Sequence, residues 1–346
     1  MRISMLAPFE PNALRGLIAG VSSLERNGLD VLWVGEPYGF DAPTTLAFFA
    51  ARTTRVQLGT GILPVYSRTP TLTAMTAAGL DSLSDRRAIL GLGASGPQVV
   101  EGWHGVVYDR PLQRIRETVE VCRRVWGHER LVHDGRAYQI PLPAGEGVGV
   151  GKALKMMVPP VRPDIPIYIA ALGHKTVEYA AQAADGWSPL FFSPSKALDV
   201  WGADLKHGTD RRAPTLGPLE ICAGGIVAIG PDTRHLRDLA RPQLALYIGG
   251  MGARGHNYYN DLFARYGYEP EARLIQDLYL AGKRSQAEAA IPDRFLDEVT
   301  LCGPRTYIKE RLSEYKRAGV TVFNAEPVGG DVVRVIAELA EIAADA

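Results

Sequence analysis

The feature that most constrains the fold is a regular alternation of short apolar runs with longer stretches of helical periodicity. Eight runs rich in β-branched residues are each followed by turn residues and by a segment with apolar residues at helical spacing. Continuous apolar runs are typical of strands covered on both faces, so the pattern indicates a parallel sheet of βα units. The expected strands are residues 3–7, 31–35, 56–63, 88–92, 165–171, 186–191, 219–229 and 320–325. The expected helices are residues 14–26, 44–52, 71–82, 112–126, 176–184, 234–247, 307–317 and 332–343.

Eight strands alternating with eight helices predict a closed (β/α)8 TIM barrel, an α/β fold. Such a barrel needs about 250 residues, so this chain of 346 residues has room for insertions. We place them at 128–164 and 250–303, within a single domain over 1–346. Within the first insertion, the glycine-rich stretch 145–151 is a candidate lid. A two-domain Rossmann enzyme is the structural alternative.

The charge balance and the cysteines exclude several classes of protein. Thirty-eight Lys and Arg balance thirty-eight Asp and Glu, so no net positive field would attract nucleic acid or an anionic membrane. No apolar run reaches the roughly 18 to 20 residues of a membrane span, and no targeting signal is visible at the N-terminus. Cys122, Cys222 and Cys302 have neither disulfide-framework nor zinc spacing. We therefore expect a cytoplasmic protein without a metal site, a nucleic-acid partner or a membrane partner.

A glycine motif follows the fourth expected strand. The stretch from Gly91 through Gly93 to Gly96 satisfies G-x-G-x-x-G, the dinucleotide fingerprint. In a Rossmann unit it would open the first βαβ unit, whereas three βα units precede it here. We interpret the glycines as allowing the backbone to approach a flat ligand at the C-terminal mouth of the strand, where barrel active sites lie. A dinucleotide site and a plain tight turn remain alternatives.

Three other strand ends carry candidate residues. The segment Ala171, Leu172, Gly173 and His174 leads from the fifth strand into a helix, where backbone N–H groups favour a phosphate; an ordinary βα turn is the alternative. Two glycines before Ile62 suggest an irregular backbone at the end of the third strand, or a simple bulge. Glu36 would place a carboxylate at the same mouth, where it could also cap a helix.

Two further side chains lie in the loop after the glycine motif. His104 and Tyr108 could supply a proton or stack on a ring, and a structural role is the alternative for each. The sequence has no G-x-S-x-G elbow, Walker motif or H-E-x-x-H motif, so hydrolase and NTPase activities lack their usual signatures.

Taken together, four motifs resemble one enzyme family. They are Val34-Gly35-Glu36, Leu58-Gly59-Thr60-Gly61-Ile62-Leu63-Pro64, Leu90-Gly91-Leu92-Gly93-Ala94-Ser95-Gly96-Pro97-Gln98 and Tyr168-Ile169-Ala170-Ala171-Leu172-Gly173. In this order and spacing they resemble the luciferase-like flavin and deazaflavin family, in its branch that uses coenzyme F420. The resemblance extends over nearly the whole chain.

The resemblance implies a deazaflavin ring across the barrel mouth and a phosphate tail at the loop after the fifth strand. The Gly61–Ile62 bond matches the non-prolyl cis peptide of the family, which supports the ring, and Pro64 follows it. Glu36 matches an acidic position near the polar edge of the ring. The other matching positions are Ala94, Ser95 and Gly96 at the ring, and Ala171, Leu172, Gly173 and His174 at the phosphate.

The activity implied is hydride transfer between F420 and an unidentified small organic substrate, in either direction. The candidate proton donors are Glu36, His104 and Tyr108, and Tyr66 and Trp103 are expected to line the substrate cavity. Members of the family are commonly homodimers. The sugar-phosphate dehydrogenases of the family have a glutamate and a histidine at the positions of Gly96 and Pro37, so a different substrate is expected here. An FMN-dependent monooxygenase and a non-catalytic F420-binding protein are the alternatives.

Overall fold

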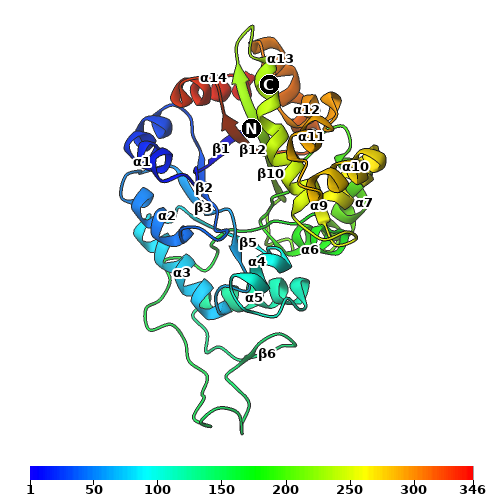
Figure 1. Ribbon diagram of the computed structural model, residues 1–346. Helices are drawn as coiled ribbons and strands as arrows, with labels where there is room; N and C mark the ends of the chain where they lie inside the picture. The colour runs from blue at the N-terminus through cyan, green and yellow to red at the C-terminus, as the bar shows by residue number, and fades with distance from the viewer. Residues whose placement is uncertain (346) are drawn as a thin grey trace. The chain divides into compact units, whose positions relative to one another are not determined.

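The computed structural model describes residues 1–345 and has the fold class that the sequence predicts, a (β/α)8 barrel (Figure 1). A strand is present within each of the eight expected ranges. The chain divides into two compact units. Unit 1 comprises residues 1–6, 23–31 and 171–346, and unit 2 comprises residues 7–22 and 32–170.

The sheet of unit 1 is parallel and has the strand order β11-β10-β12-β1, with β9 pairing the beginning of β10. In register, Ser4 of β1 lies opposite Asn324 of β12, and Gly224 of β10 lies opposite Asn324 on the other side. The short strand β11 was not expected from the sequence. The strands of this unit are β1 (Arg2–Leu6), β9 (Gly186–Trp187), β10 (Glu220–Ile229), β11 (Leu301–Gly303) and β12 (Val322–Pro327).

Helices cover unit 1, and one of the predicted helices is divided. The prediction of one helix over 234–247 is wrong, because the segment is a 3-10 helix, an α-helix and a π-helix in succession. Pro242 is the second residue of this α-helix, next to its junction with the 3-10 helix, and cannot donate a backbone hydrogen bond. The helices of the unit are α6 (His174–Ala183), α7 (Ala197–Thr209), η1 (Arg234–Ala240), α8 (Arg241–Ala245), η2 (Leu246–Gly250), α9 (Tyr258–Phe263), η3 (Ala264–Tyr268), α10 (Glu269–Leu280), α11 (Arg284–Ala289), α12 (Asp293–Val299), α13 (Arg305–Arg317) and α14 (Val332–Asp345).

Unit 2 has the strand order β2-β3-β5-β8, with β4 pairing the end of β5. The strand predicted over 56–63 is interrupted, because β3 ends at Thr60 and β4 begins at Leu63. Its strands are β2 (Val31–Val34), β3 (Gln57–Thr60), β4 (Leu63–Pro64), β5 (Ala88–Gly93), β6 (His133–Asp134), β7 (Gln139–Ile140) and β8 (Ile167–Ile169). Its helices are α1 (Pro11–Arg26, of which residues 11–22 belong to this unit), α2 (Ala42–Ala50), α3 (Pro70–Leu83), α4 (Pro97–Gly102) and α5 (Pro111–Trp126).

The segment 128–164 of unit 2 contains only the hairpin β6–β7 and otherwise runs as a long loop below α3 and α5 (Figure 1). The buried carboxylate of Glu117 on α5 holds this hairpin, because it accepts hydrogen bonds from the backbone N–H groups of Arg136, Ala137 and Tyr138. A lid role for residues 145–151 stays a prediction.

No helix among residues 1–345 is both long enough and apolar enough to cross a membrane. The three cysteines are buried, and none of them forms a disulfide among residues 1–345.

Candidate active site

In unit 2, the segment expected to support the ring is a bend between β3 and β4. The peptide bond between Gly61 and Ile62 is cis, as predicted. The N–H of Gly61 donates to the carbonyl of Val34 at 2.7 Å. The Thr60 hydroxyl donates to the carbonyl of Gly91 and accepts from its N–H, both at 2.8 Å. These hydrogen bonds fix the bend to β2 and β5.

The glycines of the motif after β5 serve different purposes. A Cβ added at Gly91 would lie 1.9 Å from the carbonyl oxygen of Thr60, and one added at Gly93 would lie 2.9 Å from Cδ1 of Ile62. A Cβ at Gly96 would have no atom within 4 Å. The backbone of the bend therefore requires glycine at position 91, whereas Gly93 packs against the Ile62 side chain, and of these three glycines Gly96 alone faces open space.

The motif does not have the context of a dinucleotide fingerprint. Gly96 is the N-cap of α4, which has only six residues. A Rossmann fingerprint opens a long helix in the first βαβ unit of its domain. The local structure therefore disfavours the dinucleotide alternative.

Tyr108 and Ser95 contact each other. Ser95 has a left-handed backbone conformation with a φ of 59°, and its carbonyl accepts a hydrogen bond from the Tyr108 hydroxyl at 3.4 Å. The Tyr108 ring stacks on Tyr66 with 5.2 Å between centroids, and the Tyr66 hydroxyl donates to the carbonyl of Asp109 at 2.8 Å. Tyr108 therefore joins the segment after β5 to the loop before α5.

Glu36 is part of an ion pair and a helix cap. Its carboxylate accepts hydrogen bonds from both terminal nitrogens of Arg68, one of them at 2.8 Å, and its side chain is 9% exposed. The same carboxylate accepts from the N–H of Ala42, the first residue of α2, at 2.9 Å. The carboxylate therefore serves as a hydrogen-bond acceptor for Arg68 and for the first turn of α2. These contacts favour the capping alternative over proton donation.

His104 has a buried ring nitrogen without a partner. Among residues 1–345, no hydrogen-bond partner lies near its Nε2 atom. Buried polar atoms are normally paired, so an orphaned nitrogen is a candidate contact for a ligand. The roles of His104, Tyr108 and Glu36 in catalysis stay predictions.

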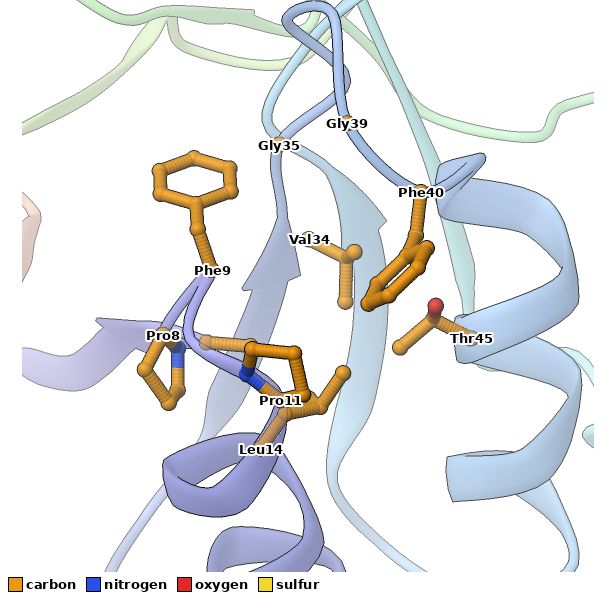
Figure 2. A pocket seen from close by; sticks show the side chains of 10 residues that line it. Pro8, Phe9, Pro11, Leu14, Val34, Gly35, Gly39, Phe40 and Thr45 are labelled. Carbon is orange, nitrogen blue, oxygen red and sulfur yellow. The ribbon is translucent and has the colours of Figure 1, made fainter.

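A cavity of about 140 Å³ lies in unit 2 between the loops that follow β1 and β2. Figure 2 shows Phe40 and Thr45 on one side of it and Pro8 and Pro11 on the other. Its wall has no ionisable side chain, and neither Tyr66 nor Trp103 lines it. The space suits an apolar group. The complete lining is Ala7, Pro8, Phe9, Pro11, Leu14, Val34, Gly35, Gly39, Phe40 and Thr45.

In unit 1, the segment expected to bind phosphate is the beginning of α6. Gly173 is the N-cap, and no side chain caps the helix. The first N–H groups of a helix lack intrahelical partners, so they are free to bind an anion. The indole N–H groups of Trp187 and Trp201 donate to the carbonyls of Ala171 and Leu172, each at 2.9 Å. These bonds fix the loop while leaving its N–H groups unused.

A cation lies beside this helix end. Arg265 of η3 donates to the carbonyl of Leu172 at 3.1 Å and to Nε2 of His174 at 3.2 Å. The other ring nitrogen of His174, Nδ1, is 2.6 Å from the carboxylate of Asp204, so this nitrogen carries the proton in that hydrogen bond. Burial lowers the pKa of Arg265, and among residues 1–345 no carboxylate lies within ion-pair distance of it. The site therefore has a positive charge available to an anion.

Sequence reasoning did not identify Arg265. The residue belongs to the insertion at 250–303, about ninety positions from the loop that it contacts, and no local motif surrounds it. Asp261 and Glu269 lie four residues before and after Arg265, so the sequence favoured an ordinary surface ion pair over a contact with a ligand.

The chain is similar to several known proteins. A family model described as luciferase-like monooxygenase matches residues 1–322. The protein Rv3520c of Mycobacterium tuberculosis, named as a proposed coenzyme F420-dependent oxidoreductase, is 40% identical over 323 residues, which cover 92% of each chain. The 5,10-methylenetetrahydromethanopterin reductase of Archaeoglobus fulgidus is 25% identical over 319 residues, which cover 90% of this chain and 89% of that protein.

A solved structure has the same fold. The coenzyme F420-dependent tetrahydromethanopterin reductase of Methanopyrus kandleri superimposes with a TM-score of 0.78 at 21% identity. The match covers 100% of this chain and 98% of the reductase.

Proposed function

The chain belongs to the luciferase-like monooxygenase family and is an F420-dependent oxidoreductase of this class, and we propose that it transfers a hydride between coenzyme F420 and a small, uncharged organic substrate. The observation that carries the proposal is the positive site at the beginning of α6, because F420 has an anionic tail. The substrate proposed is uncharged because the cavity of unit 2 is apolar.

In unit 1, Leu172, Gly173, His174 and Arg265 would hold the phosphate of the cofactor. The uncapped N–H groups of α6 would donate to it, and the Arg265 guanidinium would supply the counter-charge. The residues fit the group, because within residues 1–345 no carboxylate lies within ion-pair distance of Arg265, and this arginine lies beside a helix N-terminus that no side chain caps.

In unit 2, we propose that the ring contacts Gly61, Ile62 and Pro64 on one side and the segment 94–96 on the other. The space around Gly96 supports this, since a side chain there would meet no protein atom within 4 Å. The bound deazaflavin would supply or accept a hydride at its ring carbon. The protein would orient the reacting carbon and exclude water.

Titration of the purified protein with each cofactor tests the proposal. We expect fluorescence quenching to report saturable F420 binding, and FMN to bind far more weakly. Tight FMN binding without F420 binding would support the FMN-dependent monooxygenase and contradict the proposal. F420 binding without reoxidation of the reduced cofactor by any member of a panel of ketones, imines and activated alkenes would support the non-catalytic alternative.

We further propose a homodimer that uses the apolar outer surface of α2 and α3. Phe48 on α2 is 51% exposed, and Leu72 and Met75 on α3 are 46% and 53% exposed. Exposed large apolar side chains that gather on neighbouring helices are typical of interfaces. Sedimentation velocity should show a dimer, which Met75→Lys should dissociate; a wild-type monomer would contradict the proposal.

We place the protein in the cytoplasm as a single-domain enzyme. The absence of disulfides among the buried cysteines of residues 1–345 is consistent with a reducing compartment.

A further inference from the structure

Glu326 is an acidic residue at the C-terminal end of β12, in unit 1, that none of the motifs includes. It is the fifth of the six residues of the strand. The C-terminal ends of barrel strands are where catalytic side chains lie in this fold class. The position therefore suggests a function.

The alternation of side chains along β12 places Glu326 on the face of the sheet opposite the helices. The Phe323 ring contacts the Tyr315 ring of α13, with 5.2 Å between centroids, so Phe323 points toward the helices. Side chains of successive strand residues point to opposite faces. Asn324 and Glu326 therefore share the other face, and Asn324 accepts a hydrogen bond there from the Ser4 hydroxyl of β1 at 3.1 Å.

The residues that lie beside Glu326 on the two neighbouring strands are apolar. Its register partner on β10 is Ile226, which is buried. On β1, Leu6 follows the register pair of Met5 and Ala325, and it is 37% exposed. An exposed leucine beside an exposed carboxyl indicates that this end of the face is open to solvent.

Glu326 has no structural partner. Among residues 1–345, its carboxyl makes neither a hydrogen bond nor an ion pair, and no charged residue of β1, β10, β12 or the neighbouring loops alters its titration. Burial alone raises the pKa of the carboxyl, although the side chain keeps contact with solvent. An isolated carboxyl that retains its proton to a higher pH than usual can serve as a general acid.

The proposed phosphate site lies at the same edge of the unit 1 sheet. The helix α6 leads into β9, which runs parallel to β10, as does β12. A helix between parallel strands runs antiparallel to them, so its N-terminus lies at the edge where the strands end. The beginning of α6 and the carboxyl of Glu326 are therefore both at this edge.

We propose that Glu326 is the proton donor of the reaction, an inference that rests on the proposed function. In the direction of reduction, the electrophilic carbon of a carbonyl, imine or activated alkene would accept the hydride that the bound cofactor would supply in its reduced form. A C–H bond forms, the π bond breaks, and its electron pair moves to the other atom of that bond or, in an activated alkene, to the end of the conjugated system. Glu326 gives its proton to that atom and becomes a carboxylate. In the direction of oxidation, the carboxylate takes the proton back.

Infrared difference spectroscopy tests the inference without turnover. The difference between wild type and Glu326→Gln isolates the C=O band of the protonated carboxyl, which is followed as a function of pH with and without F420. We expect a band that persists above the pH at which an ordinary glutamate ionises, and a midpoint that rises when F420 covers the carboxyl. A band that disappears at the ordinary value, or one that F420 does not change, would overturn the inference.

Kinetics supply the second measurement, with a carbonyl or activated alkene that reoxidises the reduced cofactor. Rates for the wild type should fall as the pH rises through the midpoint of the carboxyl, and Glu326→Gln should remove this limb and lower kcat about 100-fold or more. The matched control Glu310→Gln, at an exposed glutamate on α13, should change neither. If F420 fails to bind the wild type, the proposed function itself fails; if F420 binds and Glu326→Gln keeps the wild-type pH profile, only the role of Glu326 is wrong.

Discussion

The two glycines at positions 91 and 96 provide a matched test of how the bend between β3 and β4 constrains the sequence. An alanine Cβ at position 91 would lie 1.9 Å from the carbonyl oxygen of Thr60, which is part of the backbone and cannot rotate away. Overpacking of this kind costs about 1 to 3 kcal/mol, and we expect Gly91→Ala to be at the upper end or beyond it because the obstructing atom belongs to a buried strand. The hydrogen bonds of the Thr60 hydroxyl to Gly91 would be distorted as well.

Gly96→Ala adds the same methyl group five residues later, where no atom lies within 4 Å. The φ of Gly96 is −108°, which alanine adopts without strain. We therefore expect its stability to stay within about 0.5 kcal/mol of the wild type. If the ring of F420 lies against the segment 94–96, the added methyl group should weaken F420 binding instead.

Thermal and urea unfolding, together with F420 titration, measure both effects. Gly91→Ala should lower the free energy of unfolding by about 3 kcal/mol, with a fall in Tm of roughly 1 to 2 °C per kcal/mol for a chain of this size. Gly96→Ala should keep the wild-type Tm and bind F420 less tightly. Equal stabilities of the two variants would refute the explanation of Gly91, and unchanged F420 affinity in Gly96→Ala would refute the proposed ring position.

Three further predictions concern single side chains. Burial raises the pKa of Glu117, but hydrogen bonds from Gln113, Ala137, His133 and Tyr138 together lower it below its ordinary value. The ionised carboxylate therefore stabilises the fold above the pKa that Glu117 has in the unfolded chain, and this stabilisation is lost as the pH falls below about 4. Glu117→Gln should reduce stability at pH 7 by about 2 to 3 kcal/mol and flatten this acid dependence, which urea unfolding at several pH values would check. Arg265→Met should weaken F420 binding about 10- to 100-fold. The control Arg254→Met, at an arginine whose side chain is 64% exposed, should leave F420 binding unchanged. Equal F420 affinities of the wild type and Arg265→Met would remove Arg265 from the phosphate site. Burial raises the pKa of Cys302 to about 11 and also raises that of Cys122. A thiol reagent at pH 8 should therefore label these two cysteines only when the protein unfolds. Rapid labelling of the native protein would contradict their burial.

Local patterns predicted the strands and the irregular backbone after β3, because both depend on short-range chemistry. The apolar runs located all eight barrel strands, and the glycines around Ile62 indicated the irregular backbone that interrupts the third. Errors occurred where neighbours decide the conformation. The segment 186–191 continues as a strand only to Trp187, and Phe191 has a φ of 55°. The helix α7 and the strand β11 were missed.

By itself, the sequence determined the order of strands and helices, the location of the bend and the loop that begins α6, since periodicity and glycine placement are properties of contiguous residues. Only the tertiary structure decided why Gly91 must be glycine, which cation accompanies the α6 loop and which face of β12 presents Glu326. Each of these depends on an atom far away in the chain: the carbonyl of Thr60, the guanidinium of Arg265 and the ring of Tyr315. A contact between residues distant in sequence is set by the packing of whole strands and helices, and no local pattern encodes it.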